Sequence, residues 1–269
     1  MPVNPGFHFP ASQSARRCTQ SPDLRRAAVP CPVAGSNQEL NLYKPSVIKV
    51  RTVSSTAYLL QGEEKSILID TLSPRRGWQL LRQLRKKGVD LSRISLILLT
   101  HGHIDHFGNA LRLKRELGAP VAIHEFDAEA VRMGRNMRLH PRNLYERVLG
   151  SMVKHLKTDG LEPDILLTGE EGGLEEFGVA ARWVRTPGHS EGSISVVLPG
   201  ESVIVGDLVI GKFSLLKKPA YPLWVKDGQQ VRDSVRKLLE YQPSTFLSGH
   251  GGPLDPAEVR KVFLKEGGS

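Results

Sequence analysis

Three histidines and one aspartate lie close together in residues 100–106, Thr-His-Gly-His-Ile-Asp-His. Imidazole and carboxylate groups are preferred ligands of zinc and similar divalent metals, and three of them with one open position make a catalytic site. His101 and His103 can point to the same side of an extended segment, because side chains alternate along it. Asp105 and His106 would follow where the chain turns into a helix. The spacing therefore predicts a metal site, with a polar loop satisfied by backbone groups as the alternative.

Three later residues could complete the same site. His189 lies in Thr-Pro-Gly-His-Ser, Asp207 in Gly-Asp, and His250 in Ser-Gly-His-Gly. Each follows an apolar segment typical of a strand and has a glycine beside it, which permits close backbone approach. Active-site groups gather at strand ends because the sheet fixes their direction and the loop exposes them. Any one of these residues alone would suggest a structural role, but together with the first cluster they indicate one centre.

Short strands and helices in alternation must position these residues. Ile94–Thr100, directly before His101, is almost purely apolar, as expected for a strand covered on both faces. Period-two patterning and flanking turn residues predict further strands at 47–53, 57–61, 66–70, 121–124, 179–186, 194–198, 203–205 and 245–247. Helices are predicted at 74–87, 106–117, 229–241 and 256–265, with helical stretches between 124 and 157. Strand clusters separated by helices, twice over, favour an α/β fold of two packed sheets with helices outside.

The motifs HxHxDH, TPGH, GD and GHG occur in this order, and over residues 47–263 the chain resembles the metallo-β-lactamase superfamily. The resemblance implies a four-layer αββα sandwich with two divalent metal ions, zinc first and iron or manganese as alternatives, at one edge of the sheets. It implies that one metal is bound by His101, His103 and His189, and the second by Asp105, His106 and His250, with Asp207 bridging both.

The resemblance also implies a reaction. A hydroxide that bridges the metals would attack an ester, thioester or lactone carbonyl, because metal ions lower the pKa of bound water. Asp105 would be the catalytic proton acceptor. Asp70, in Ile-Asp-Thr, matches the early aspartate of the family that orients a ligand histidine; its alternative is a turn or helix-capping aspartate ahead of Pro74.

The substrate stays open at this point. Asp207 stands where true β-lactamases typically supply cysteine, which disfavours antibiotic hydrolysis, and the ligand set is closer to glyoxalase II. The sequence ends soon after His250, so we expect it to lack the C-terminal glutathione-binding domain of that enzyme. Leu208, Val209 and Ile210 follow Asp207 where related lactonases carry a tyrosine. Tyr221 and Trp224 could line a pocket, with core packing as the alternative role.

Two other activities occur on the same framework. One is a mononuclear iron dioxygenase acting on persulfides, and the other is a phosphodiesterase or nuclease. The second is disfavoured because the chain has no basic platform interleaved with aromatic residues. The segment 134–157 suggests instead an anionic small-molecule substrate, with a solvated helix face as the alternative, since it carries Arg135, Arg138, Arg142, Arg147, Lys154 and Lys157.

Composition and charge indicate the domain organisation, the possible partners and the location of the protein. The chain has 269 residues, a formal charge of +9 and a pI near 9.7, which permits anionic partners without requiring them. Residues 1–38 are rich in proline, arginine and small polar residues, so we expect a disordered tail followed by one domain over 39–269. The two cysteines, Cys18 and Cys31, lie in this tail and cannot staple a core. The sequence predicts a cytoplasmic protein with no membrane partner, and it leaves the oligomeric state open.

Overall fold

The computed structural model describes residues 44–264 except 199, 201 and 213–216, and these residues belong to a single compact unit. The tail predicted over residues 1–38, with its two cysteines, lies outside the described residues. None of the described helices has the length and apolar composition that a membrane span requires.

The first half of the chain forms a six-stranded sheet in the order β1-β2-β3-β4-β5-β6. The pairs β1·β2 and β2·β3 are antiparallel, and the following pairs from β3 to β6 are parallel. The strands are β1 Ser46–Arg51, β2 Thr56–Gln61, β3 Ser66–Ile69, β4 Ile94–Leu98, β5 Val121–His124 and β6 Ile165–Leu167.

The second half forms a five-stranded sheet in the order β13-β10-β9-β8-β7, and a small pair, β11 and β12, lies beside it. In this sheet β13 is parallel to β10, and the other pairs are antiparallel. The strands are β7 Glu171–Gly173, β8 Arg182–Arg185, β9 Ile194–Leu198, β10 Ser202–Ile204, β11 Ile210–Gly211, β12 Pro219–Ala220 and β13 Thr245–Leu247.

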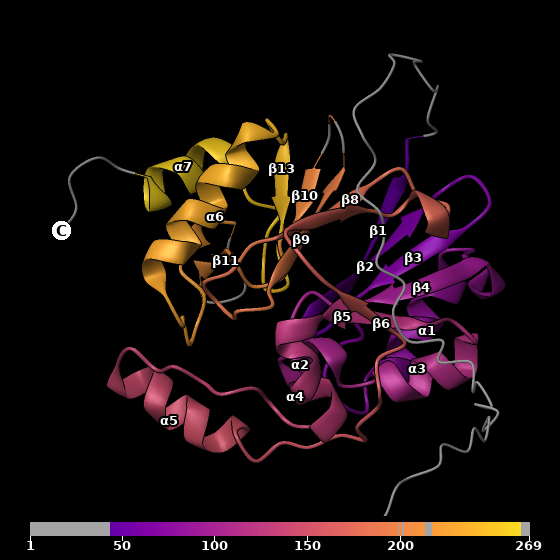
Figure 1. Ribbon diagram of the computed structural model, residues 1–269, viewed down its shortest axis with the longest axis horizontal. Helices are drawn as coiled ribbons and strands as arrows, with labels where there is room; N and C mark the ends of the chain where they lie inside the picture. Colours follow the sequence, from indigo (N-terminus) through magenta and orange to yellow (C-terminus); the bar gives the residue numbers. More distant parts are fainter. Residues whose placement is uncertain (1–43, 199, 201, 213–216, 265–269) are drawn as a thin grey trace, which may run out of the picture. The chain divides into compact units, whose positions relative to one another are not determined.

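Helices cover the outer face of each sheet (Figure 1). The α-helices are α1 Gly77–Lys86, α2 Ile104–Phe107, α3 Ala110–Leu117, α4 Ala128–Met133, α5 Leu144–Val153, α6 Gly228–Glu240 and α7 Pro256–Phe263. Short 3-10 turns lie at η1 Leu91–Arg93, η2 Glu125–Asp127 and η3 Glu175–Phe177.

Three apolar cores separate these layers. Along β2, Leu59 packs outward with the helices of the first half, whereas Tyr58 and Leu60 pack inward against the second sheet. This alternation follows from the two-residue period of a strand. A third core joins the second sheet to α6 and α7 through residues such as Val203 and Val235. The order helix, sheet, sheet, helix confirms the two packed sheets with outer helices predicted from the sequence patterns, and it is the four-layer αββα sandwich that the family resemblance implies.

One predicted helix, residues 106–117, is two helices in the structure. The chain leaves helical geometry at Asn109, between α2 and α3. The Asn109 amide donates hydrogen bonds to the backbone oxygens of Thr71 and Ser73, both at 2.7 Å, so it serves the neighbouring loop instead of a continuous helix. Strands β6, β7, β11 and β12 were not predicted.

Strand direction brings the ends of the central strands to one edge. In the first sheet β3, β4 and β5 are parallel, so their carboxyl ends coincide. In the second sheet β8 and β10 are both antiparallel to β9, and β13 is parallel to β10, so these three also end together. A backbone hydrogen bond of 2.9 Å from Ile194 N to Thr100 O joins the sheets at this edge.

Candidate metal centre

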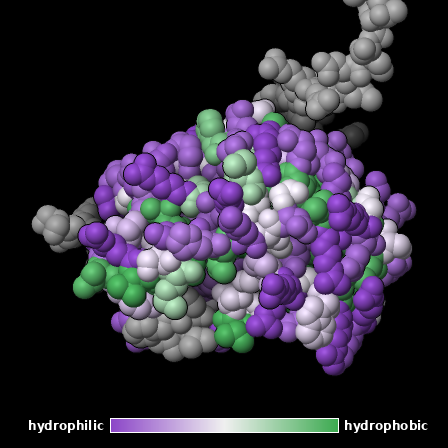
Figure 2. Space-filling model, turned by 90° about the horizontal axis from the view of Figure 1, so that it is seen from below, coloured by the Kyte–Doolittle hydropathy of each residue, from purple (hydrophilic) through white to green (hydrophobic). Residues whose placement is uncertain are grey.

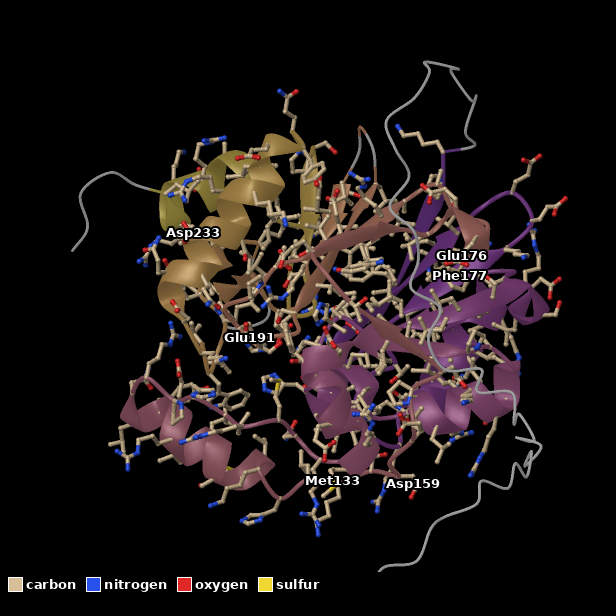
Figure 3. All side chains as sticks on the ribbon, in the orientation of Figure 1. Met133, Asp159, Glu176, Phe177, Glu191 and Asp233 are labelled. Carbon is tan, nitrogen blue, oxygen red and sulfur yellow. The ribbon has the colours of Figure 1, made fainter. Side chains whose placement is uncertain are left out.

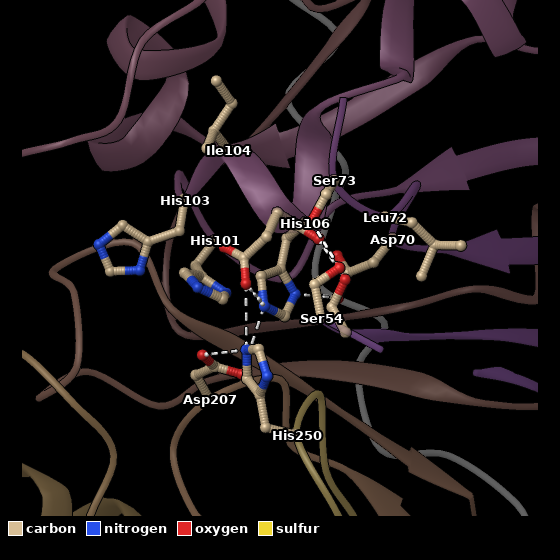
Figure 4. Close-up of polar contacts among 12 residues, drawn as sticks. Ser54, Asp70, Leu72, Ser73, His101, His103, Ile104, His106, Asp207 and His250 are labelled. Atoms are coloured by element: carbon tan, nitrogen blue, oxygen red, sulfur yellow. Dashed lines mark hydrogen bonds and ion pairs between the residues drawn. The ribbon is translucent and has the colours of Figure 1, made fainter. Parts of the chain in front are cut away.

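The turn after β4 carries the first four site residues, and Figure 4 shows His106 and His101 next to Asp207 and His250, with His103 further to the left. His103 caps α2 with an extended backbone, and Asp105 and His106 lie in the first turn of that helix. His101 and His103 lie with their ring centroids 5.0 Å apart, so the two side chains share one side of the segment as predicted.

The other half of the chain delivers His189, Asp207 and His250 to the same place. Nε2 of His189 lies 2.8 Å from Nδ1 of His103. Asp207 lies between the two halves: its Oδ1 is 3.3 Å from Nε2 of His106, and its Oδ2 is 3.1 Å from Nε2 of His250. Nε2 of His250 also lies 3.1 Å from Oδ2 of Asp105.

The structure therefore brings all seven candidate ligands together. Their ligand atoms form three overlapping groups, within each of which the atoms lie no more than 4.8 Å apart. The groups are His101, His103 and His189; His101, His106 and Asp207; and Asp105, His106 and His250. The first and third coincide with the two ligand triads that the family resemblance implies, and Asp207 joins them.

Several of these side chains have buried polar atoms without a hydrogen-bond partner in the described part of the chain. They are Nε2 of His101, Nε2 of His103 and Nδ1 of His189, while Nε2 of His106 and Oδ1 of Asp207 contact each other as an ion pair, at 3.3 Å. A buried polar atom without a partner is costly, so native proteins rarely leave one. Divalent cations would satisfy such lone pairs, and the donor set of imidazoles and carboxylates fits them. The cluster is thus suited to divalent metal binding.

The first group is ready to bind a cation at neutral pH. Burial lowers the pKa of His103 to about 4, and burial together with the neighbouring His103 lowers that of His189 to about 3. Burial also lowers the pKa of His101 well below its usual value. These imidazoles are therefore neutral near pH 7, which is the form that binds metal.

The second group holds protons when no cation is present. Burial opposes a charge on His250, but the carboxylates of Asp207 and Asp105 outweigh it and raise its pKa to about 10. The pKa of His106 is raised in the same way. The pKa of Asp105 falls to about 2, because the charges of His106 and His250 outweigh its desolvation. A cation that binds here must displace protons from the two imidazoles.

Asp70 fixes the orientation of His106. It follows β3 in a left-handed backbone conformation, with φ of 62°, which is uncommon outside glycine. Its Oδ2 accepts a hydrogen bond of 2.8 Å from Nδ1 of His106, and its Oδ1 accepts one of 2.8 Å from Thr100 N. Because a carboxylate only accepts, Nδ1 carries the proton of this hydrogen bond, so Nε2 is the atom left to bind a cation once its own proton is displaced. Asp70 does not cap α1, whose N-cap residue is Arg76.

Replacing Asp70 with asparagine is expected to weaken metal binding by about 10 to 100-fold, because the partners of ligand histidines commonly contribute that much. The amide keeps the size of the side chain but can present its NH₂ to Nδ1 and favour the wrong tautomer. Competition with a chromogenic chelator measures the affinity. Asp233→Asn, on the outer face of α6 (Figure 3), is the matched control. A folded Asp70→Asn protein with unchanged affinity would contradict the role.

Asp127 is a positioning residue that the sequence analysis missed. Its buried carboxylate accepts hydrogen bonds from Gly102 N at 2.8 Å, Ser190 Oγ at 2.6 Å and Gly192 N at 2.9 Å. It therefore ties the loop of His101 and His103 to the loop of His189. The signal that could have found it was its place just beyond β5, the same strand-end position that marks the ligands.

Glycine is required at position 249 for the centre to close. A Cβ there would lie 2.5 Å from Oδ1 of Asp207 and 2.6 Å from Cε1 of His106. No side chain fits at such distances, so the loop that carries His250 can approach only as bare backbone.

Trp224 and Glu146 form a wall beside His103. The ring centroids of Trp224 and His103 lie 6.1 Å apart. Trp224 has a positive φ of 54°, a rare conformation for a bulky residue. Its indole N–H donates a 2.9 Å hydrogen bond to the backbone oxygen of Glu146 on α5. Trp224 thus lies beside His103, and its lining of a substrate pocket stays a prediction. The sequence analysis missed Glu146, because its link to Trp224 joins residues 78 positions apart.

Comparisons with known proteins agree with this geometry. The family model of the metallo-beta-lactamase superfamily matches residues 50–250. The probable metallo-hydrolase YflN of Bacillus subtilis is 27% identical over 223 residues, which cover 72% of this chain and 78% of the relative. The atrochrysone carboxyl ACP thioesterase of Aspergillus fumigatus is 25% identical over 230 residues, which cover 81% of this chain and 59% of the relative.

Solved structures match the fold as well. The HARLDQ motif mutant of a metallo-beta-lactamase from Cronobacter sakazakii superposes with a TM-score of 0.57 at 25% identity. The match covers 76% of this chain and 77% of that one. A metallo-beta-lactamase family protein from Thermus thermophilus gives a TM-score of 0.57 at 24% identity, covering 81% of this chain and 76% of that one.

Proposed function

This chain belongs to the metallo-β-lactamase superfamily, and on that premise we propose that it is a binuclear metal-dependent hydrolase of a small molecule with an ester, thioester or lactone carbonyl. The observation that supports this most directly is the convergence of seven histidine and aspartate side chains into three overlapping ligand groups. Two nearby cations of zinc, or alternatively of iron or manganese, would supply an acidified water and a Lewis acid at the carbonyl oxygen.

The residues of the centre divide the work. His101, His103 and His189 would hold one cation, and Asp105, His106 and His250 the other, with Asp207 touching both. Asp70 orients His106, and Asp127 holds the two ligand loops together. Trp224 would exclude water from one side of the substrate.

Asp105 is the proposed proton acceptor. Its side chain is 31% exposed, the most open of the residues in these ion pairs, so it borders the space where a substrate would enter. Its contacts to His106 and His250 both use Oδ2, which leaves Oδ1 as the atom proposed to take the proton. Its pKa of about 2, held down by the charges of His106 and His250, keeps it ionised at neutral pH.

A thioester is the first substrate class to test. The Asp207 carboxylate takes the place where β-lactamases typically have cysteine, which disfavours antibiotics. One relative that covers 81% of this chain is a thioesterase by name, and another is a probable metallo-hydrolase. Hydrolysis would convert the thioester and water into a carboxylic acid and a thiol.

Metal analysis followed by a substrate screen tests the proposal. We expect about two zinc-like ions per chain and hydrolysis of thioesters or lactones that is lost on chelation and restored by metal. Elemental analysis measures the bound metal, a thiol-release assay measures thioester hydrolysis, and release of acid measures lactone hydrolysis. A single iron per chain, with oxygen uptake when a persulfide is added, would instead indicate a dioxygenase. Cleavage restricted to phosphodiesters would replace it by a nuclease activity.

A further inference from the structure

A groove of about 410 Å³ runs between α5 and residues 136–141. Its apolar lining comes from Met137, Leu139 and Pro141, and its charged lining is entirely basic, from Arg138, Arg147 and Lys154. Arg147 and Lys154 lie on one face of α5, because they are two helical turns apart. Figure 2 views the molecule from the side where α5 lies in Figure 1, and hydrophobic and hydrophilic groups are interspersed there.

The cations of this groove have no carboxylate partner among the described residues. Within the described ranges, no ion pair joins Arg138, Arg147 or Lys154 to a carboxylate. Many other surface cations of the chain do have such partners, and examples are Arg112–Glu116, Lys114–Asp164, Arg132–Glu162, Arg236–Asp233 and Lys261–Glu258. Uncompensated cations that line one concave surface attract an anionic ligand.

Residues that line the groove are hydrogen-bonded to the loop that carries the ligand histidines. Met137 N donates a 3.2 Å hydrogen bond to the oxygen of Gly102, the residue between two ligand histidines. Oδ1 of Asn136 accepts one of 2.8 Å from Ile104 N, at the start of α2. A molecule in this groove therefore lies beside the loop that carries His103.

Glu146 fixes the helical wall of the groove in place. Its carboxylate is buried and accepts hydrogen bonds from Nη2 of Arg142 at 2.7 Å and from Trp224 N at 3.3 Å. Gly150, one turn further along α5, lets the helix contact the indole, since a Cβ there would lie 3.2 Å from Nε1 of Trp224. The groove, α5 and the aromatic wall beside His103 are thus one connected assembly.

We propose that this groove binds a phosphate-bearing arm of the substrate, an inference that rests on the hydrolase function proposed above. Guanidinium groups bind phosphate oxygens through paired hydrogen bonds. The three cations of the groove also match the charge of a phosphate dianion better than they match the charge of a single carboxylate. The apolar lining, with Met137 and Leu139, would contact the aliphatic part of the arm. The scissile carbonyl of the same molecule would then lie at the metal centre.

A matched pair of thioesters tests the groove, butyryl-phosphopantetheine and butyryl-pantetheine, which differ only in one phosphate. We expect the ratio of their kcat/KM values to favour the phosphorylated substrate by about tenfold or more. The double variant Arg138→Glu/Arg147→Glu should abolish that preference. Lys86→Glu/Lys87→Glu, at the exposed end of α1, makes the same change in net charge away from the groove and should preserve it.

Binding to the metal-free protein separates the groove from the catalysis. Calorimetric titration with the S-methyl thioethers of phosphopantetheine and pantetheine should show about tenfold tighter binding of the phosphorylated compound, lost in the arginine double variant. Phosphate-dependent binding without hydrolysis of any ester, thioester or lactone would support the groove and overturn the hydrolase function. Equal binding and equal kcat/KM for the two compounds would overturn the groove, whether or not both thioesters are hydrolysed. Circular dichroism checks that each variant is folded.

Discussion

Replacing Asp207 with alanine is expected to reduce bound metal to one ion per chain or fewer and to slow hydrolysis by more than about 100-fold. Mutating a residue that only orients a metal ligand commonly lowers metal affinity or activity by about 10 to 100-fold. Mutating the residue that contacts both ligand groups should lower them further. Its two oxygens lie 3.3 Å from Nε2 of His106 and 3.1 Å from Nε2 of His250. Without this carboxylate, His106 and His250 also lose the negative charge that raises their pKa most.

Elemental analysis after dialysis and a steady-state thioester assay measure the two effects. Asp159→Ala changes the same residue type in an exposed loop distant from the centre (Figure 3) and should retain both metal and activity. If the Asp207→Ala protein kept two ions and its activity, the assignment of Asp207 as the bridging residue would be wrong.

Asp105→Asn is expected to lower kcat by about 10² to 10⁴-fold, the range over which a positioned proton acceptor acts. Asparagine nearly matches the size of aspartate, so the contact of 3.1 Å between residue 105 and Nε2 of His250 should remain while the negative charge is lost. Metal in the group of His101, His103 and His189 should be unaffected, because Asp105 is not a member of that group.

Titration with excess metal separates the two roles of Asp105. If Asp105 served only as a metal ligand, excess metal would occupy the second group in the variant and restore kcat to that of the unchanged protein. If Asp105 also accepts a proton, kcat of the variant stays low at metal saturation, which is the outcome we expect. Asp90→Asn, in the exposed cap of η1, is the control.

The sequence predicted the layers because its apolar patterns are unambiguous where strands are long or fully buried. Ile94–Thr100 was predicted as a strand, and β4 occupies Ile94–Leu98. β7 has the sequence Glu-Gly-Gly, which has no strand propensity of its own, and it exists because it pairs with β8. The break between α2 and α3 arises from hydrogen bonds of Asn109 to a loop more than thirty residues earlier in the chain. Such long-range contacts leave no local pattern.

The candidate site was more predictable than the fold around it. Ligand side chains stand at strand ends beside glycines, and that local signal marked His189, Asp207 and His250 before any geometry was known. Asp127 carries the same strand-end signal but lies in no motif, so its three hydrogen bonds became visible only when the loops were placed. Glu146 lies 78 residues before its partner Trp224, and no spacing rule could join them.

The distribution of the ligands along the chain constrains how the protein matures. Residues 101–106 bring four of the seven groups, but the remaining three arrive at 189, 207 and 250. During synthesis the amino-terminal half can close its own sheet and collect only part of the ligand set. The proposed pair of metal ions could be bound tightly only after the ribosome has released His250, so we expect nascent chains and truncated fragments to be poor competitors for scarce cellular metal.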